Sequence, residues 1–135
     1  MIDFGATTTE ANVKIYESAK GMFAALLHEV RELSKKKPDA TLSDSKVKLI
    51  NNVLNDLMTF LKQEPEGKYL HILENESLPQ VSDALLMMVQ FDAALDAFRE
   101  RYYRYVGADG FRRGETCWIT EERLAEWEAV ENEDD

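Results

Sequence analysis

Three segments of the sequence carry apolar side chains at alternating spacings of three and four residues, and this pattern constrains the fold most. Side chains spaced in this way lie on one face of an α-helix. The stripes comprise Tyr16, Ala19, Phe23, Leu26, Val30 and Leu33, then Val47, Ile50, Leu54, Leu57 and Leu61, then Val81, Leu85, Met88, Phe91, Leu95, Phe98, Tyr102 and Tyr105. Because each stripe must be covered from water, we expect the three helices to pack lengthwise on one another.

Capping and turn residues predict where these helices begin and end. The predicted N-caps are Thr7 for the first helix, Ser43 or Asp44 for the second, Ser77 for the third and Thr120 for a short last helix. Pro38 and Gly107 are predicted to end the first and third helices. Residues 68–73 are predicted to form a further short helix, and residues 108–117 to form a loop.

The predicted fold is therefore all-α, an elongated antiparallel helical bundle of three long helices plus one or two short helices. Short connectors make sequential helices antiparallel. A chain of 135 residues fits a single domain, which we assign to residues 1–130, with an acidic mobile tail at 131–135. The predicted core includes Phe23, Leu54, Leu95 and Phe98.

Negative charge is concentrated at the C-terminal end of the sequence. The net charge is −10, yet residues 114–135 hold nine acidic side chains and one basic one. This balance argues against direct nucleic-acid binding, which needs local positive charge. The longest apolar run, residues 84–89, is far too short for a membrane span. With no apolar leader and a lone cysteine, Cys117, we expect a soluble cytoplasmic protein.

Candidate catalytic and metal-binding residues lack the partners that such chemistry needs. Cys117 and Arg123 have the spacing of a cysteine phosphatase loop, but Glu121 and Glu122 between them would repel a phosphate. His28 lies four residues before Glu32, a spacing that could seat a metal on one helix face. The Glu-x-x-His repeat of di-metal bundles does not occur in the sequence. We therefore expect no cofactor and no metal.

The most unusual composition lies at residues 99–113, where five arginines alternate with aromatic residues. Such a segment suits stacking and interface hot spots, and it equally suits the solvated end of an amphipathic helix. We expect the last helix to dock through Leu124 and Trp127, with its glutamates facing these arginines. The predicted partner-binding residues are Arg101, Arg104, Tyr105, Arg112, Arg113, Glu122 and Glu126.

Three hypotheses for function follow from these features. The first is a non-enzymatic protein-binding module: a small adaptor, a regulator or a subunit of a larger assembly. The second is an acidic inhibitor or immunity-type protein that binds a basic nuclease or a nucleic-acid-binding partner. The third is an enzyme of unfamiliar type, using His28 or Cys117 in a site formed only by folding. The partner is another protein in the first two hypotheses, and a homo-oligomer remains open.

Overall fold

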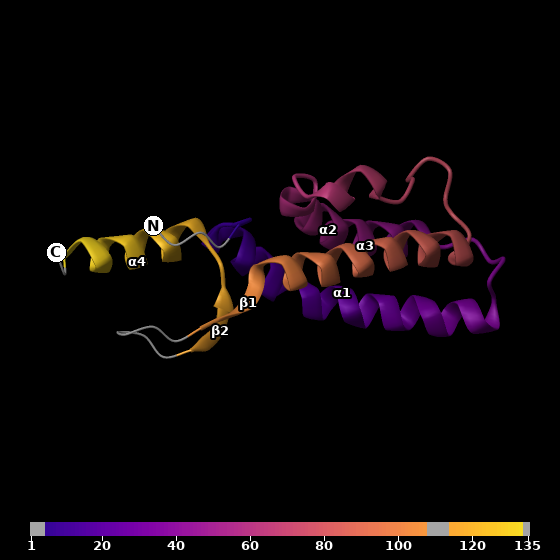
Figure 1. Cartoon of the computed structure of the whole chain (residues 1–135). Coiled ribbons are helices and arrows are strands. Elements are labelled where there is room, and N and C mark those ends of the chain that lie inside the picture. The colour runs from indigo at the N-terminus through magenta and orange to yellow at the C-terminus, as the bar shows by residue number, and fades with distance from the viewer. Residues whose placement is uncertain (1–4, 108–113, 134–135) are drawn as a thin grey trace.

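The structure is a computed structural model that describes residues 5–107 and 114–133, most of which are helical (Figure 1). The elements are α1 (Glu10–Lys36), α2 (Asp44–Leu61), the 3₁₀-helix η1 (Pro65–Tyr69), α3 (Val81–Tyr102), β1 (Tyr103–Val106), β2 (Glu115–Trp118) and α4 (Glu121–Glu133). The prediction of a mainly helical chain is confirmed, and the two-stranded sheet was not predicted. The last helix includes the first three residues of the predicted tail, whereas residues 134–135 lie outside the described residues.

Short polar side chains cap the helices, but not always at the predicted residue. Thr9, and not Thr7, caps α1, and its hydroxyl accepts from the N–H of Asn12 at 3.2 Å. The helix begins later than predicted because Thr8 is in a β-bridge with Thr120. The helix α3 also begins later than predicted, after Gln80. The caps predicted at Ser43 and Thr120 are confirmed, since both hydroxyls accept from an N–H three residues later.

The helix α1 runs antiparallel to α3, whereas α2 and α3 run parallel to each other. Phe60 and Phe98, near the C-terminal ends of α2 and α3, have ring centroids 4.7 Å apart. Thr41 and Gln80, directly before α2 and α3, form a β-bridge. The prediction that these sequential helices are antiparallel is therefore wrong. The helices α2 and α3 are parallel because the connection at residues 62–80 returns along the length of the helices before α3 begins (Figure 1).

The stripes of α1, α2 and α3 meet in one apolar core. Phe23, Leu54, Leu95 and Phe98 are all buried, as predicted. Burial of side chains of this size is the main stabilising contribution to such a fold. We refer to α1, α2 and α3 together as the helical body.

The connection between α2 and α3 is held by a buried polar side chain. Asn51 donates from Nδ2 to the carbonyl of Leu73 and accepts the N–H of Leu73 at Oδ1, both at 2.8 Å. The helix predicted at residues 68–73 is wrong beyond Tyr69, because Leu70 is extended and Leu73 bonds to Asn51. A buried polar group without a partner is costly, so this pair of bonds fixes the path of the connection.

A β-hairpin replaces the predicted end of α3 and the C-terminal part of the predicted loop. The helix ends at Tyr102 instead of continuing to Gly107, and β1 pairs with β2 in antiparallel register, with Tyr103 opposite Trp118. The rings of Tyr103 and Trp118 lie 5.1 Å apart. The N–H of Ile119 also donates to the carbonyl of Tyr102 at 2.7 Å, which satisfies a helix-end carbonyl. Aromatic residues favour strands when a paired strand can cover them.

The hairpin and α4 carry a second apolar cluster of their own. Val106, Cys117 and Ile119 are buried in it, and Leu124 and Trp127 pack against them. Beyond this cluster α4 projects past the end of the helical body (Figure 1). No helix in the described part of the chain is both long enough and apolar enough to cross a membrane.

Candidate protein-interaction site

The first turn of α4 is joined to the start of α1 by backbone hydrogen bonds. The N–H of Thr8 donates to the carbonyl of Ile119 at 3.1 Å, and the N–H of Glu121 donates to the carbonyl of Thr8 at 2.9 Å. Glu122, a predicted partner-binding residue, accepts the N–H of Glu10 at 3.1 Å through Oε1. A carboxylate is stabilising at a helix N-terminus, so Glu122 acts within the fold as a cap for α1.

The apolar side of α4 faces the hairpin. Leu124 and Trp127 pack on the second cluster, so the predicted docking of this helix is found, although its base is the hairpin and not the helical body. Ile119 and Leu124 occupy the hydrophobic-staple positions around the cap at Thr120. Arg123 adds an ion pair to Glu115 of β2 at 3.5 Å. These contacts fix the direction in which α4 leaves the hairpin.

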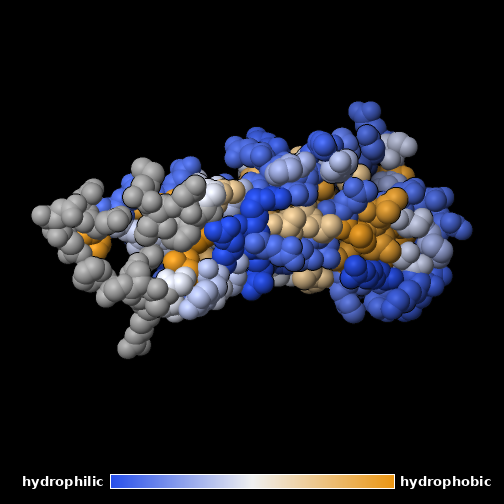
Figure 2. Space-filling view, in the orientation of Figure 1, coloured by the Kyte–Doolittle hydropathy of each residue, from blue (hydrophilic) through white to orange (hydrophobic). Residues whose placement is uncertain are grey.

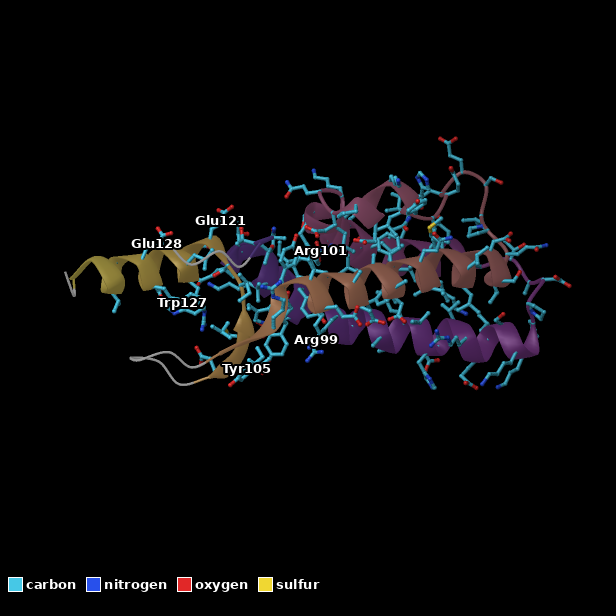
Figure 3. All side chains as sticks on the ribbon, in the orientation of Figure 1. Arg99, Arg101, Tyr105, Glu121, Trp127 and Glu128 are labelled. Carbon is cyan, nitrogen blue, oxygen red and sulfur yellow. The ribbon has the colours of Figure 1, made fainter. Side chains whose placement is uncertain are left out.

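Several acidic side chains of α4 are exposed, in contrast to Leu124 and Trp127. Glu121 and Glu128 point away from the side that carries Trp127 (Figure 3). Glu128 follows Glu121 by seven positions, which places the two on one helical face two turns apart. Glu126 is exposed as well. The predicted contact residues on this helix were Glu122 and Glu126, and Glu128 was among the glutamates expected to face the arginines. Glu121 and Glu128 lie three residues before and four residues after Leu124, and therefore on its flank of the helix.

Arg101 binds two carboxylates at η1 and not the glutamates of α4. Its guanidinium lies 2.6 Å from Oε1 of Glu64 and 2.9 Å from Oε2 of Glu66. The hydroxyl of Tyr102 donates to the same Glu64 carboxylate at 2.8 Å. The predicted pairing of Arg101 with the glutamates of α4 is therefore wrong, because η1 brings closer acceptors. Gly67 permits this approach, since a Cβ there would lie 2.6 Å from the carbonyl oxygen of Leu61.

The carboxylates around Arg101 change the proton affinity of the groups in this cluster. The hydrogen bond from Arg101 lowers the pKa of Glu66, and the same bond raises the pKa of Arg101. Burial, followed by the hydrogen bond to Glu64, raises the pKa of Tyr102 to about 12. These shifts favour an ionised Glu66, a charged Arg101 and a neutral Tyr102, which are the forms that make these bonds. The cluster therefore holds η1 against the end of α3.

Two of the remaining predicted site residues, Arg104 and Tyr105, lie on β1 of the hairpin. Tyr105 is 68% exposed, and its hydroxyl lies so close to Gly114 that a side chain there would collide with it. Arg104 is exposed and lies opposite Cys117 in the strand register. Arg112 and Arg113 lie outside the described residues. Tyr105 therefore presents an aromatic ring to solvent on the hairpin, on the side toward which Trp127 points and away from Glu121 and Glu128 (Figure 3).

An aromatic cluster connects the hairpin to the helical body, and sequence reasoning did not identify it. The ring of Trp118 lies 5.2 Å from that of Tyr16 and 5.7 Å from that of Phe98. Arg99 stacks on Tyr103 with its guanidinium carbon 4.8 Å from the ring centroid. Burial raises the pKa of Tyr16 within this cluster. The hairpin therefore joins the helical body through contacts between aromatic rings. Such contacts add stability to that gained from burying the surface of the rings.

The residues weighed for catalysis are not assembled into a site in the described part of the chain. Cys117 is buried in the second cluster. Glu32 binds Lys35 at 3.0 Å, and this hydrogen bond lowers the pKa of Glu32. Within residues 5–107 and 114–133, no three His, Cys, Asp or Glu side chains lie together in a way that could hold a metal ion.

Apolar surface is also exposed away from α4. Figure 2 shows it over the first half of α3, where Leu86 is 63% and Val89 38% exposed.

Comparisons with protein-family models, curated proteins and solved structures found no match to this chain. The geometry of the chain itself therefore carries the functional argument.

Proposed function

We propose that this chain is a non-enzymatic protein-binding module, and that α4 with the hairpin presents the partner surface. In this proposal α1, α2 and α3 act as one elongated bundle that supports the surface. The observation that carries it is that two apolar side chains anchor α4 while most of its carboxylates stay exposed. Trp127 and Leu124 are used to anchor the helix, while Glu121, Glu126 and Glu128 remain exposed.

The charge of this end defines the chemistry of the partner. Residues 114–135 contain nine acidic side chains and one basic one, so a complementary surface is rich in lysine and arginine. Complementary charge increases association rates and rejects acidic competitors more than it adds affinity. Affinity then needs an apolar or aromatic contact, and the exposed ring of Tyr105 beside Arg104 supplies one.

The structure changes the roles of two predicted contact residues, Arg101 and Glu122. Arg101 is held by Glu64 and Glu66, and a partner would have to break those bonds to use it. Glu122 is similarly engaged at the start of α1. We therefore propose Tyr105 and Glu126, together with Glu121 and Glu128, as contact residues, and treat Arg101 and Glu122 as supports of the fold.

The second candidate function uses the same surface with a narrower partner. An acidic inhibitor or immunity-type protein would cover the basic substrate-binding face of a nuclease or of another nucleic-acid-binding protein. The exposed carboxylates of α4 suit this role because such groups can occupy positions that otherwise bind phosphates. Competition with nucleic acid distinguishes this candidate from a general adaptor.

The experiment is affinity purification of the full chain from its native host, followed by binding measurements with the purified partner. Glu126→Lys/Glu128→Lys should weaken binding about tenfold or more, given about 1 kcal/mol per lost contact. The matched control is Glu74→Lys/Glu76→Lys, two exposed carboxylates in the connection before α3. A partner that binds all three proteins equally would refute the proposed surface.

A further inference from the structure

A groove lies between the last turns of α1 and the first half of α2, at the end of the molecule opposite α4 (Figure 1). Its volume is about 370 Å³, within the usual range for small-molecule sites. The apolar side chains that line it are Leu26, Val30, Leu33, Leu42, Leu49 and Ile50. The groove is therefore an apolar trough formed at the seam between two helices.

The groove is not closed by the fold, and its apolar lining continues along the seam. Leu49 lines it and is 52% exposed, although it lies on a helix with a complete buried stripe. Met22, one helical turn before Leu26 and therefore on the same flank of α1, is 60% exposed. Large apolar side chains left open beside a groove are typical of a binding site.

Charged side chains give the groove two different ends. Lys36 and Lys46 line the end where α1 finishes and α2 starts. Glu29 lies seven residues before Lys36, about 10 Å away along the helix. Glu32 also lines the groove but is bound by Lys35 at 3.0 Å. One end therefore carries two lysines together with Glu32, which lies one turn before Lys36 and pairs with Lys35, while Glu29 lies two turns before Lys36 along the apolar part.

We propose that this groove binds a straight-chain carboxylate, with its hydrocarbon chain on the leucines and its carboxylate at Lys36 and Lys46. A lysine can cover apolar surface with its stem while its ammonium group meets an anion at the rim. The ten residues from Leu26 to Lys36 span about 15 Å. At about 1.2 Å per bond in an extended chain, about ten to twelve carbons fill that length.

The groove lies at the other end of the molecule from α4, and none of its residues belongs to the proposed partner surface. Three other kinds of occupant differ from a carboxylate in the contacts that they would make. A cationic amphiphile would place its head at Glu29, and a neutral one would have no preferred end. An amphipathic helix from a partner protein would use the apolar lining without needing a carboxylate at the lysines.

The test is calorimetric titration of the full chain with decanoate, decanol and decyltrimethylammonium, each below its micelle concentration. We expect one decanoate to bind per chain, about tenfold tighter than decanol, because two charge-assisted contacts are added. Decyltrimethylammonium should bind more weakly than either. Methyl NMR signals of Leu26, Leu33 and Leu49 should shift on binding.

Two matched pairs of variants locate the site. Leu49→Asp should weaken decanoate binding at least tenfold, whereas Leu86→Asp, a similarly exposed leucine on α3, should leave it unchanged. Lys36→Glu/Lys46→Glu should lose the preference for decanoate over decyltrimethylammonium. Lys14→Glu/Lys62→Glu, exposed lysines at the opposite ends of α1 and α2, should keep it.

Several results would overturn the proposal. They are no decanoate binding at all, equal binding of decanol and decanoate, tighter binding of the cationic amphiphile, or binding that Leu49→Asp leaves intact. If Leu49→Asp instead abolishes binding of the protein partner while decanoate fails to bind, the groove is a protein-docking surface and the proposed ligand is wrong.

Discussion

Thr8 and Thr120 form a parallel β-bridge that joins the start of α1 to the start of α4. They come from near opposite ends of the chain, and the bridge contains two backbone hydrogen bonds of 3.1 and 2.9 Å. Together with the ring contacts of Trp118, this bridge holds the hairpin and α4 on the helical body. The orientation of the proposed partner surface therefore depends on a contact that local sequence does not encode.

Replacing Thr8 by proline should loosen α4 without unfolding the helical body. The substitution removes the N–H that donates to Ile119, and loss of one such bond costs about 1–3 kcal/mol. Amide hydrogen exchange should accelerate in α4 and β2 and stay slow in α2. Thr8→Ala keeps the backbone N–H and is the matched control. Equal exchange in α4 of Thr8→Pro and wild type would show that the bridge does not hold α4.

Trp127→Ala should lower the free energy of unfolding of the C-terminal cluster by about 1–3 kcal/mol, because the ring is only partly buried. Val130→Ala is the control, since Val130 is 54% exposed on the same helix. Its effect should stay within about 0.5 kcal/mol. Urea unfolding followed by circular dichroism measures both. No loss in Trp127→Ala would mean that α4 is not anchored by this ring.

Asn51→Leu should destabilise the protein by about 2–3 kcal/mol, although leucine is apolar and similar in size. The substitution leaves the N–H and carbonyl of Leu73 buried without their bonds to Asn51. Asn52→Leu, at the exposed neighbouring position of α2, is the control and should change stability little. A stable Asn51→Leu protein would show that the connection finds other partners.

Tyr102 should make the protein less stable in alkali. Its folded pKa is about 12, above the unfolded value of about 10, so its contribution is complete below pH 10 and is lost as the pH rises toward 12. The free energy of unfolding of Tyr102→Phe should therefore fall less over this range. The difference in free energy of unfolding between wild type and Tyr102→Phe should become about 2 kcal/mol smaller as the pH rises from 10 toward 12. Tyr69→Phe, at a 59% exposed position, is the control. Parallel pH profiles of wild type and Tyr102→Phe would contradict this assignment.

Periodicity alone predicted the parts of the fold that depend on local pattern. The stripes containing Phe23, Leu54, Leu95 and Phe98 are buried, as their spacing indicated. The caps at Ser43 and Thr120 follow from the preference of short hydroxyl side chains for helix starts. These features need information from only a few neighbouring residues.

The features that were missed depend on partners distant in sequence. The spacing from Phe98 through Tyr102 to Tyr105 continues a helical stripe, but the pairing of Tyr103 with Trp118 favours a strand there. The aromatic and β-branched residues in the segments 103–106 and 115–118, on either side of a glycine-containing loop, were the available signal for a hairpin. Arg101 was assigned to α4 by proximity in sequence, whereas η1 supplies its carboxylates through the fold.

If the exposed carboxylates of α4 bind a basic protein, the dissociation constant of the complex must depend on salt. With the captured partner, wild type should lose affinity steeply as salt rises, because exposed ion pairs are screened. Glu126→Lys/Glu128→Lys should bind more weakly at low salt and show a clearly shallower slope, while Glu74→Lys/Glu76→Lys should retain the wild-type slope. Identical slopes for wild type and Glu126→Lys/Glu128→Lys would contradict the account.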